Sequence, residues 1–559
     1  MLRKHYLGYL AATLGSAVPA HAQTTPAIVL EATPTAIDPV SQTGALTVEM
    51  KIPGMVLGQG EKLMSLGLGM PGQARSHRVG DVSARDKQGA IGLQEKPGMV
   101  TDWTVARTVS GDVTIRYTLM LESIPMLQGG PPTAVRVDGR AFSGIGEVLF
   151  ARPNIDTPLA IKVNWHLDQM PEGAQAVTSF GDGDIDLPVG APDRLGHAVY
   201  MVGPVWREPT DGAIDGFSSV WADDPGFDPR PIMGWTAKLH SWMSNFFGDD
   251  TPPPYRVFMR YNPMNAGGGA ALYNSFLVTY GKNVTGESMK YILGHEMTHT
   301  WTANDLGKWY DEGNAVYYQA LLPWRAGLLS TDEYLADINE TASRYYTNLL
   351  RNTPEEEAVR RFWEDTRVRV LPYDRGAMYF AKLGGMIHRA SNGKRSIDDL
   401  VLELIDRKKK GQPITDAIWF DMLRREIGDE GVALHRAMLA GELVLPESGD
   451  FGPCFRRETK MVRRFDVGFD FASLIGAKKI VHGLKQGSEA EKAGLRDGDN
   501  ISYGVALDAV QGDVNRLFTV QVTRDGKSFP ITYLPRGEAV ETYQWERDPA
   551  VPESACRNR

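Results

Sequence analysis

Residues 291–318 read YILGHEMTHTWTANDLGKWYDEGNAVYY, and the interpretation of the whole chain depends on this stretch. His295 and His299 are four residues apart, so on a helix their side chains lie on one face, one turn above the other. Two imidazoles in that position point at one cation, while Glu296 lies about 100° round the helix axis. From there the Glu296 carboxylate reaches a water on the metal without binding the metal itself. The His-Glu-x-x-His spacing therefore predicts a hydrolytic zinc site.

A third ligand is expected from a second helix in the same stretch. Glu312 lies at the start of DEGNAVYYQALL, which follows the polar turn TANDLGK, so an antiparallel return of the chain is feasible. Two histidines and one glutamate leave the fourth position of a tetrahedral ion to water, whereas structural zinc sites are closed by four protein ligands. We therefore expect one catalytic Zn²⁺ ion, with Glu296 as general base. The alternative is a helix whose histidines only satisfy hydrogen bonds in the core. Residues that would orient the histidines are expected among Asn304, Asp305 and Asp311.

The N-terminus is typical of an exported protein. MLRKHYLGYLAATLGSAVPAHAQTTP has a basic start, a short apolar stretch and small residues at Ala20 and Ala22, which is the layout of a signal peptide spanning residues 1–22. A membrane anchor is the alternative, but the apolar stretch is too short to span a bilayer comfortably. The net charge of −9 argues against nucleic acid as a partner. We expect a periplasmic or secreted protein without a stable membrane anchor.

The pattern along the mature chain predicts a multidomain α+β protein. Residues 23–230 hold short alternating runs such as GALTVEMKIPG and DVTIRYTLML, which predict an N-terminal β-sandwich. Residues 231–450 are expected to be mostly helical after two strands, one in YRVFMRYNP and one in AALYNSFLVTYG. The lysine run in SIDDLVLELIDRKKKG is expected to be a solvated helix end. Residues 451–540 return to strands with one short helix at 489–493. Residues 541–559 are expected to form a polar tail that is loosely held unless Cys556 ties it down.

The two cysteines, Cys454 and Cys556, bracket the C-terminal region. In an oxidising compartment such a distant pair can close a loop. The sequence does not give the Cα separation that a disulfide requires, so the bridged and the free states both stay open. Two cysteines are too few for a cysteine-based zinc site.

These motifs resemble those of gluzincin metallopeptidases. GHEMTHTW…WYDEGNAVYY is similar to their His-Glu-x-x-His and Trp-x-x-Glu-Gly-x-Ala patterns, and within them it most resembles the glycyl aminopeptidase family. LPYDRGAMYFAKLGGMIHRASNGKRSIDDLVLEL, residues 371–404, is similar to that family's Tyr-x-x-Gly helix and its Gly-Lys-x-Ser-hydrophobic-Asp-Asp segment. The resemblance implies a thermolysin-like peptidase domain. Its zinc ligands would be His295, His299 and Glu312, with Glu296 as general base.

The same resemblance assigns a role to Tyr373, in the sequence YDRG. Tyr373 would align with the family's tyrosine that hydrogen-bonds the oxyanion, and a phenol O–H is a suitable donor to a developing negative charge. The alternative is a tyrosine at a helix start that packs on the core.

One position departs from the family pattern. Family members carry, on a Gly-rich strand, a glutamate that grips the substrate's α-amino group, whereas NAGGGAALYNSFLVTYG places Ala271 or Leu272 there. Without that carboxylate the attraction for a free N-terminus is weaker, so the sequence predicts a peptidase and leaves aminopeptidase specificity open. The strand is still expected to hold an extended peptide by backbone pairing. Its substrate-binding residues are expected to be Gly268, Gly269, Ala270 and Ala271; a flexible turn is the alternative.

The C-terminal region resembles a PDZ domain. Val467, Gly468 and Phe469, in DVGFDF, lie where such domains receive a peptide C-terminus, and GSEAEKAGLRDGDNI resembles the turn-helix-turn that follows. The second helix beside the groove is poorly represented in VALDAVQGDVNRL, so a peptide receptor and a structural cap both stay open. The competing hypothesis for the whole chain is accordingly a non-catalytic PDZ-like peptide-binding protein with a structural metal. On the first hypothesis the partners are peptide or protein substrates.

Overall fold

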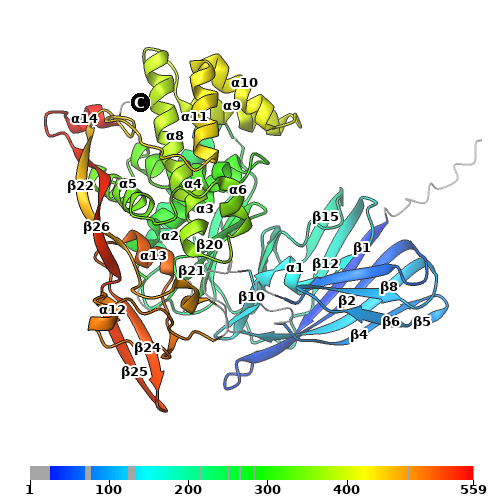
Figure 1. The fold of residues 1–559 in the computed structure, drawn as a ribbon. Coiled ribbons are helices and arrows are strands. Elements are labelled where there is room, and N and C mark those ends of the chain that lie inside the picture. Colours follow the sequence, from blue (N-terminus) through cyan, green and yellow to red (C-terminus); the bar gives the residue numbers. More distant parts are fainter. Residues whose placement is uncertain are drawn as a thin grey trace, which may run out of the picture.

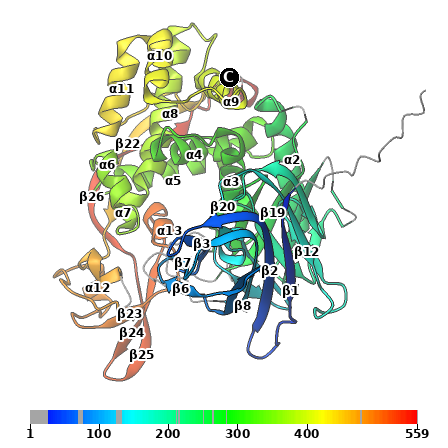
Figure 2. The ribbon, with the colours of Figure 1, turned by 90° about the vertical axis from the view of Figure 1, so that its right-hand side faces the viewer.

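The computed structural model describes residues 26–69, 77–123, 133–210, 212–213, 216–249, 251–262, 266–281, 284–475 and 478–557. The expected signal peptide, residues 1–22, lies outside these described residues. Figures 1 and 2 show a set of N-terminal sheets, a helical body in green and yellow, and a small C-terminal part in orange and red beside that body. No helix among the described residues is long and apolar enough to cross a membrane.

The N-terminal part consists of sheets that share one hydrophobic core. Its elements are β1 (Ala27–Pro34), β2 (Thr43–Leu57), β3 (Lys62–Gly67), β4 (Val79–Asp86), β5 (Gly89–Ile91), β6 (Leu93–Lys96), β7 (Val100–Val105), β8 (Val109–Glu122), β9 (Arg136–Asp138), β10 (Ala141–Ile145), α1 (Gly146–Leu149), β11 (Arg152–Pro153), β12 (Leu159–Trp165), β13 (Gln175–Thr178), β14 (Gly181–Asp182), β15 (Ile185–Gly190) and β16 (Val199–Gly203). A seven-stranded sheet has the order β15-β12-β1-β2-β8-β4-β5, beside a four-stranded β11-β3-β7-β6 and a five-stranded β14-β13-β16-β10-β9. Residues of β1, β2 and β8 are buried at every second position, which is the period of a half-buried strand. The predicted N-terminal sheet domain is therefore confirmed.

A further five-stranded sheet has the order β17-β18-β19-β21-β20 and belongs to the helical body. Its strands are β17 (Trp206–Glu208), β18 (Phe217–Trp221), β19 (Tyr255–Tyr261), β20 (Gly269–Leu272) and β21 (Ser275–Tyr280). β18 precedes residue 230 but pairs with β19, so we propose a domain boundary near residue 204 in place of 230. AALYNSFLVTYG was expected to be one strand and instead forms two, joined by a turn at Tyr273 and Asn274. Asn274 has a φ of +42°, in the left-handed region that asparagine tolerates.

The helical body has the mostly helical character predicted for residues 286–442. Its helices are α2 (Arg230–Phe246), η1 (Glu287–Met289), α3 (Lys290–Thr302), α4 (Lys308–Arg325), α5 (Thr331–Tyr346), α6 (Glu355–Arg360), α7 (Thr366–Arg369), α8 (Leu371–Ala390), α9 (Ile397–Lys409), α10 (Asp416–Ile427) and α11 (Asp429–Leu439). Met289, Leu293 and Met297 are buried at a spacing of four, which fixes the inner face of α3. Capping boxes begin α5 at Ser330 and α9 at Ser396.

Glycines allow the central helices to approach closely. A Cβ on Gly313 of α4 would lie 2.6 Å from the Cα of Gly376 of α8, so the two backbones touch there. A Cβ on Gly294 of α3 would overlap the carbonyl oxygen of Gln319 of α4. These contacts explain why a glycine follows Glu312 in the sequence. They let α4 approach α3 at one place and α8 at another.

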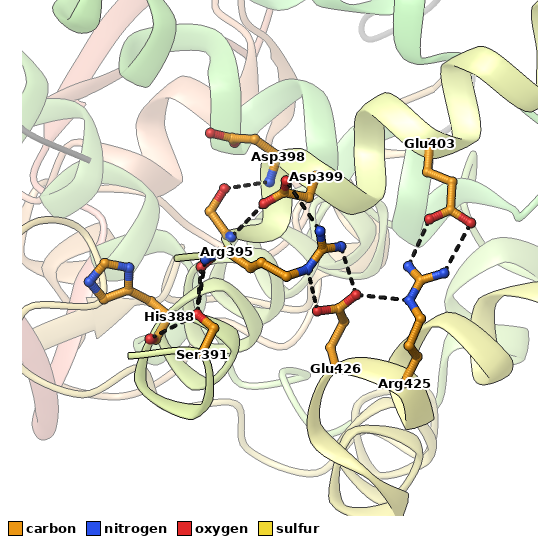
Figure 3. Close-up of polar contacts among 9 residues, drawn as sticks. His388, Ser391, Arg395, Asp398, Asp399, Glu403, Arg425 and Glu426 are labelled. Atoms are coloured by element: carbon orange, nitrogen blue, oxygen red, sulfur yellow. Dashed lines mark hydrogen bonds and ion pairs between the residues drawn. The ribbon is translucent and has the colours of Figure 1, made fainter. Parts of the chain in front are cut away.

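Ion pairs hold α9 against its neighbours (Figure 3). Arg395 donates to both carboxylate oxygens of Glu426 at 2.6 and 2.7 Å, and Arg425 joins Glu426 to Glu403. Asp398 of α9 accepts hydrogen bonds from a tyrosine and an arginine of α4, at 2.6 and 2.7 Å. The GKRSIDDL segment thus fixes α9 to both α10 and α4.

The C-terminal part is a small β-rich unit on a two-stranded stem. Its elements are β22 (Phe455–Phe465), η2 (Phe471–Leu474), α12 (Glu489–Lys492), β23 (Asn500–Ser502), α13 (Leu507–Gly512), β24 (Phe518–Arg524), β25 (Lys527–Tyr533), β26 (Arg536–Arg547) and α14 (Glu553–Cys556). β22 pairs antiparallel with β26, and the sheet β23-β24-β25 lies between them in sequence with its own core. The C-terminal segment is tied down, which is the alternative that a bond at Cys556 left open. Trp545 is 1% exposed, and Cys556 is disulfide-bonded to Cys454 with the Cα atoms 5.2 Å apart.

The predicted PDZ loop lies in this unit, with Val467 and Phe469 buried and Gly468 at a φ of +84°. Among the described residues, the short helix η2 follows the loop directly and no strand does. The stretch VALDAVQGDVNRL contains a short helix, α13, six residues long. Binding of a peptide C-terminus at this loop stays a prediction.

Candidate active site

α3 and α4 bring three potential ligand atoms together. The Nε2 atoms of His295 and His299 are 3.2 Å apart, and each is 3.5 Å from Oε2 of Glu312. A tetrahedron with zinc bonds of about 2.0 Å has edges of about 3.3 Å, so these atoms fit three of its corners. Within the described part of the chain, this is the group of histidine, cysteine and acidic side chains that could hold a metal ion. The donor set of two imidazoles and one carboxylate also suits zinc.

The orientation of His295 is set by a residue that the sequence interpretation missed. Nδ1 of His295 donates to Oε1 of Gln319 at 3.2 Å, which leaves Nε2 with its lone pair toward the ligand group. Gln319 in turn donates to Asp337 at 2.6 Å. Gln319 lies seven residues after Glu312, two helical turns along the same face of α4, and this spacing could have identified it from the sequence. In the described structure, neither imidazole is hydrogen-bonded to the residues expected in this role, Asn304, Asp305 and Asp311.

Glu312 is held as an anion. Burial raises the pKa of Glu312, but the imidazoles of His295 and His299, when they are protonated, outweigh burial and bring this pKa well below its ordinary value. Nζ of Lys308, one helical turn before Glu312, lies 3.3 Å from Oε1 of Glu312 and forms an ion pair with it. A carboxylate that is already ionised is ready to bind a cation.

Glu296 lies beside the ligand group and against the sheet. Burial raises the pKa of Glu296 to about 7, while the charge on His295 and a hydrogen bond from the Ala271 backbone N–H lower it. The carboxylate packs against Gly269, in β20, with no room for a side chain there. The predicted position of Glu296, off the ligand face of α3, agrees with this arrangement.

Gly269→Ala should lower turnover about 100-fold while leaving the metal content unchanged. The added Cβ would overlap the Glu296 carboxylate and lie 2.5 Å from its Cγ, so Glu296 must move, and a displacement of about 1 Å can cost that much. Steady-state rates and metal analysis on the purified variant make the comparison. Gly234→Ala is the matched control, because an added Cβ on this α2 glycine meets nothing within 4 Å. Full turnover in Gly269→Ala would contradict the close contact between β20 and Glu296.

Tyr373 approaches the ligand group from α8. Its ring stacks on His295 with centroids 5.9 Å apart and 14° between the planes. Burial, together with the negative charges of Glu312 and Glu296, raises the pKa of Tyr373 well above its ordinary value. The phenol therefore keeps its proton and can donate it in a hydrogen bond.

All three parts of the chain line a cleft of about 2350 Å³ around these residues. The N-terminal part contributes His197, and the C-terminal part contributes Tyr503 and Asp508. Asp508, on α13, accepts hydrogen bonds from Arg369 of α7 at 2.8 Å. The predicted substrate-binding residues 268–271 line the cleft, and β20 is an edge of its sheet. The predicted PDZ loop, residues 467–469, does not line it.

No protein-family model and no curated protein matches the sequence. Among solved structures, the chain is similar to an M1 zinc metallopeptidase from Deinococcus radiodurans, with 16% identity and a TM-score of 0.47 over 76% of this chain and 95% of that chain. It is also similar to yeast LTA4 hydrolase, with 12% identity and a TM-score of 0.43 over 76% and 68% of the two chains. Both scores are too low to support an argument about this chain.

A more extensive similarity links the chain to an aminopeptidase N family protein from Idiomarina loihiensis. The TM-score is 0.68 at 15% identity, and the match covers 95% of this chain and 99% of that chain. At this identity, the similarity establishes the fold alone. The chain therefore shares its multidomain fold, over nearly its whole length, with this aminopeptidase N family protein.

Proposed function

We propose that the chain is a zinc metallopeptidase that hydrolyses peptide bonds, with one Zn²⁺ held by His295, His299 and Glu312. The observation that carries the proposal is the spacing of the three ligand atoms, at 3.2, 3.5 and 3.5 Å, which is close to the edge of a zinc tetrahedron. Three protein ligands are typical of a catalytic zinc and four of a structural one. The fold shared with the Idiomarina loihiensis protein supports the same class of activity.

Zinc in such an open site supplies a bound water with a pKa of about 7 and polarises a carbonyl group. Glu296 is placed to accept the proton of the attacking water and to pass it to the leaving amine. Burial alone disfavours the charged form of Glu296, and a cation bound by the neighbouring ligands would favour the charged form. Tyr373 is placed to donate its phenolic hydrogen bond to the carbonyl oxygen as that oxygen becomes negative.

We further propose that the substrate lies along β20. An edge strand offers backbone groups to an extended peptide, and residues 268–271 line the cleft. β20, GAAL, carries no carboxylate that would bind a free amino group. The proposal therefore covers peptide hydrolysis and leaves aminopeptidase specificity as an open prediction.

Chelation of the metal should abolish hydrolysis, and one equivalent of zinc should restore it. The purified chain is incubated with a mixture of unstructured peptides, and mass spectrometry before and after digestion identifies every cut. Metal analysis of the same sample should give one zinc per chain. Full zinc occupancy without hydrolysis of any peptide or ester would refute the peptidase. That outcome would favour the non-catalytic peptide-binding protein.

Export to the periplasm or the medium is part of the proposal. It rests on the signal-like residues 1–22, which the structure does not describe. The disulfide between Cys454 and Cys556 supports it, because such bonds persist in oxidising compartments.

A further inference from the structure

The lysine run at the end of α9 is exposed, as expected of a solvated helix end, and two of its ammonium groups each donate to a backbone carbonyl of a neighbouring segment. Nζ of Lys408 donates to the carbonyl oxygen of Ala303, which caps the C-terminus of α3, at 2.5 Å. Nζ of Lys409 donates to the carbonyl oxygen of Gly248 at 2.9 Å. Lys410 instead pairs with Asp406, one turn back on its own helix, at 2.7 Å.

Lys408 and Lys409 line a pocket of about 290 Å³, which we call the lysine pocket. Residues from α2, β19, α3 and α9 form its walls. The lysine pocket and the large cleft adjoin, because both are lined by Asn274, Thr300 and Lys408. Thr300 directly follows the ligand His299 in the chain. The lysine pocket is therefore next to the candidate zinc site.

The rest of the lysine pocket is mostly uncharged. The ring of His240 stacks on Tyr255 at 4.8 Å and lies 5.7 Å from Trp301, which makes an aromatic wall. Burial lowers the pKa of His240 to about 4, so this imidazole is neutral at pH 7. Asp249 is the one acid among the described residues that line the pocket, and its Oδ2 accepts a hydrogen bond from Nε1 of Trp301.

The two ammonium groups are available for a ligand. Each carries three donors, and in the described part of the chain each has a backbone carbonyl oxygen as its hydrogen-bond partner and no carboxylate within ion-pair distance. The described residues of the pocket thus combine an aromatic wall with two lysines and one aspartate. It fits a group with a short apolar stem and an anionic tip.

The lysine pocket adjoins the end of β20. The backbone N–H of Ala271 bonds to Glu296, and Asn274, in the turn that follows β20, lines both the cleft and the lysine pocket. A peptide bound along β20 would therefore extend toward the lysine pocket on one side of the peptide bond that is cut. We propose that the lysine pocket is a subsite for an acidic side chain, glutamate or aspartate, of that peptide. This inference rests on the proposed peptidase function.

Matched peptides test the subsite. Each pair differs by glutamate or glutamine at one position, and the pairs together scan four residues on either side of the cut. In the wild type, kcat/KM should be about three- to tenfold higher for the glutamate peptide at one position, since exposed ion pairs are individually weak. In the double variant Lys408→Gln/Lys409→Gln, the ratio of kcat/KM for the glutamate peptide to kcat/KM for the glutamine peptide should fall to about one. The arginine pair Lys408→Arg/Lys409→Arg should keep it.

Lys410→Gln is the matched control, because it changes the third lysine of the same run and should keep the wild-type ratio. Rising salt should reduce the wild-type preference without any mutation, since both ammonium groups are exposed. No glutamate preference at any position, or a preference that survives in the glutamine double variant, would overturn the subsite. Failure of the zinc-loaded wild type to cut any peptide would instead refute the peptidase itself.

Discussion

Glu296→Gln should lower kcat by about 10²- to 10⁴-fold while zinc stays at one ion per chain. The amide has the size of the carboxylate, so it fits the same space against Gly269. It cannot accept the proton of an attacking water, however, and this loss removes the general base. Zinc is retained because its three proposed ligands are unchanged.

The measurement pairs steady-state rates on a fluorogenic peptide with metal analysis and thermal unfolding of the same sample. Glu340→Gln is the matched control, since it neutralises another carboxylate of the cleft that is exposed and outside the ligand group. The control should change kcat less than threefold. If Glu296→Gln kept more than a tenth of the wild-type turnover, Glu296 would not be the base.

Tyr373→Phe should lower kcat by about 10²- to 10³-fold with little change in KM. Only the phenolic oxygen is lost, and with it a donor that acts when the carbonyl oxygen becomes negative. The ring still stacks on His295, so zinc content and the unfolding temperature should stay at their wild-type values. A defect in kcat alone is the mark of an interaction made in the transition state.

Tyr291→Phe provides the comparison for Tyr373. Tyr291 also lines the cleft, but its hydroxyl donates to the backbone carbonyl of Glu333 at 3.0 Å. Its removal should leave kcat within a factor of about three. Equal rates for Tyr373→Phe and the wild type would reduce Tyr373 to a packing residue.

The ligand group was predictable because its spacing is local. His295 and His299 lie on one face through the period of a single helix, and Glu296 follows from the same geometry. Glu312 needed one further step, the antiparallel return of α4. The close backbone contact between Gly294 and Gln319 allows that return, and no periodic signal marks it. Tyr373 could be placed only through the resemblance, because α8 lies some sixty residues further along the chain.

The remaining errors concern non-local contacts and short elements. β18 pairs in parallel with β19 across the whole of α2, and local pattern does not specify such a partner. The β20–β21 hairpin was missed because its turn, Tyr273 and Asn274, contains no glycine. Gln319 carries no charge that would mark it as a partner of His295. α13, with six residues, is too short for a helical period to be recognised.

The two-stranded stem determines what happens to the chain after a proteolytic cut in the C-terminal unit. β22 leaves the helical body and β26 returns to it, so the small unit between them is an insertion with both of its ends anchored. The disulfide between Cys454 and Cys556 closes the loop beyond the base of the stem. One proteolytic nick in the tip between β24 and β25 would therefore release nothing. Both fragments stay covalently joined, and the wall that α13 contributes to the cleft stays in place.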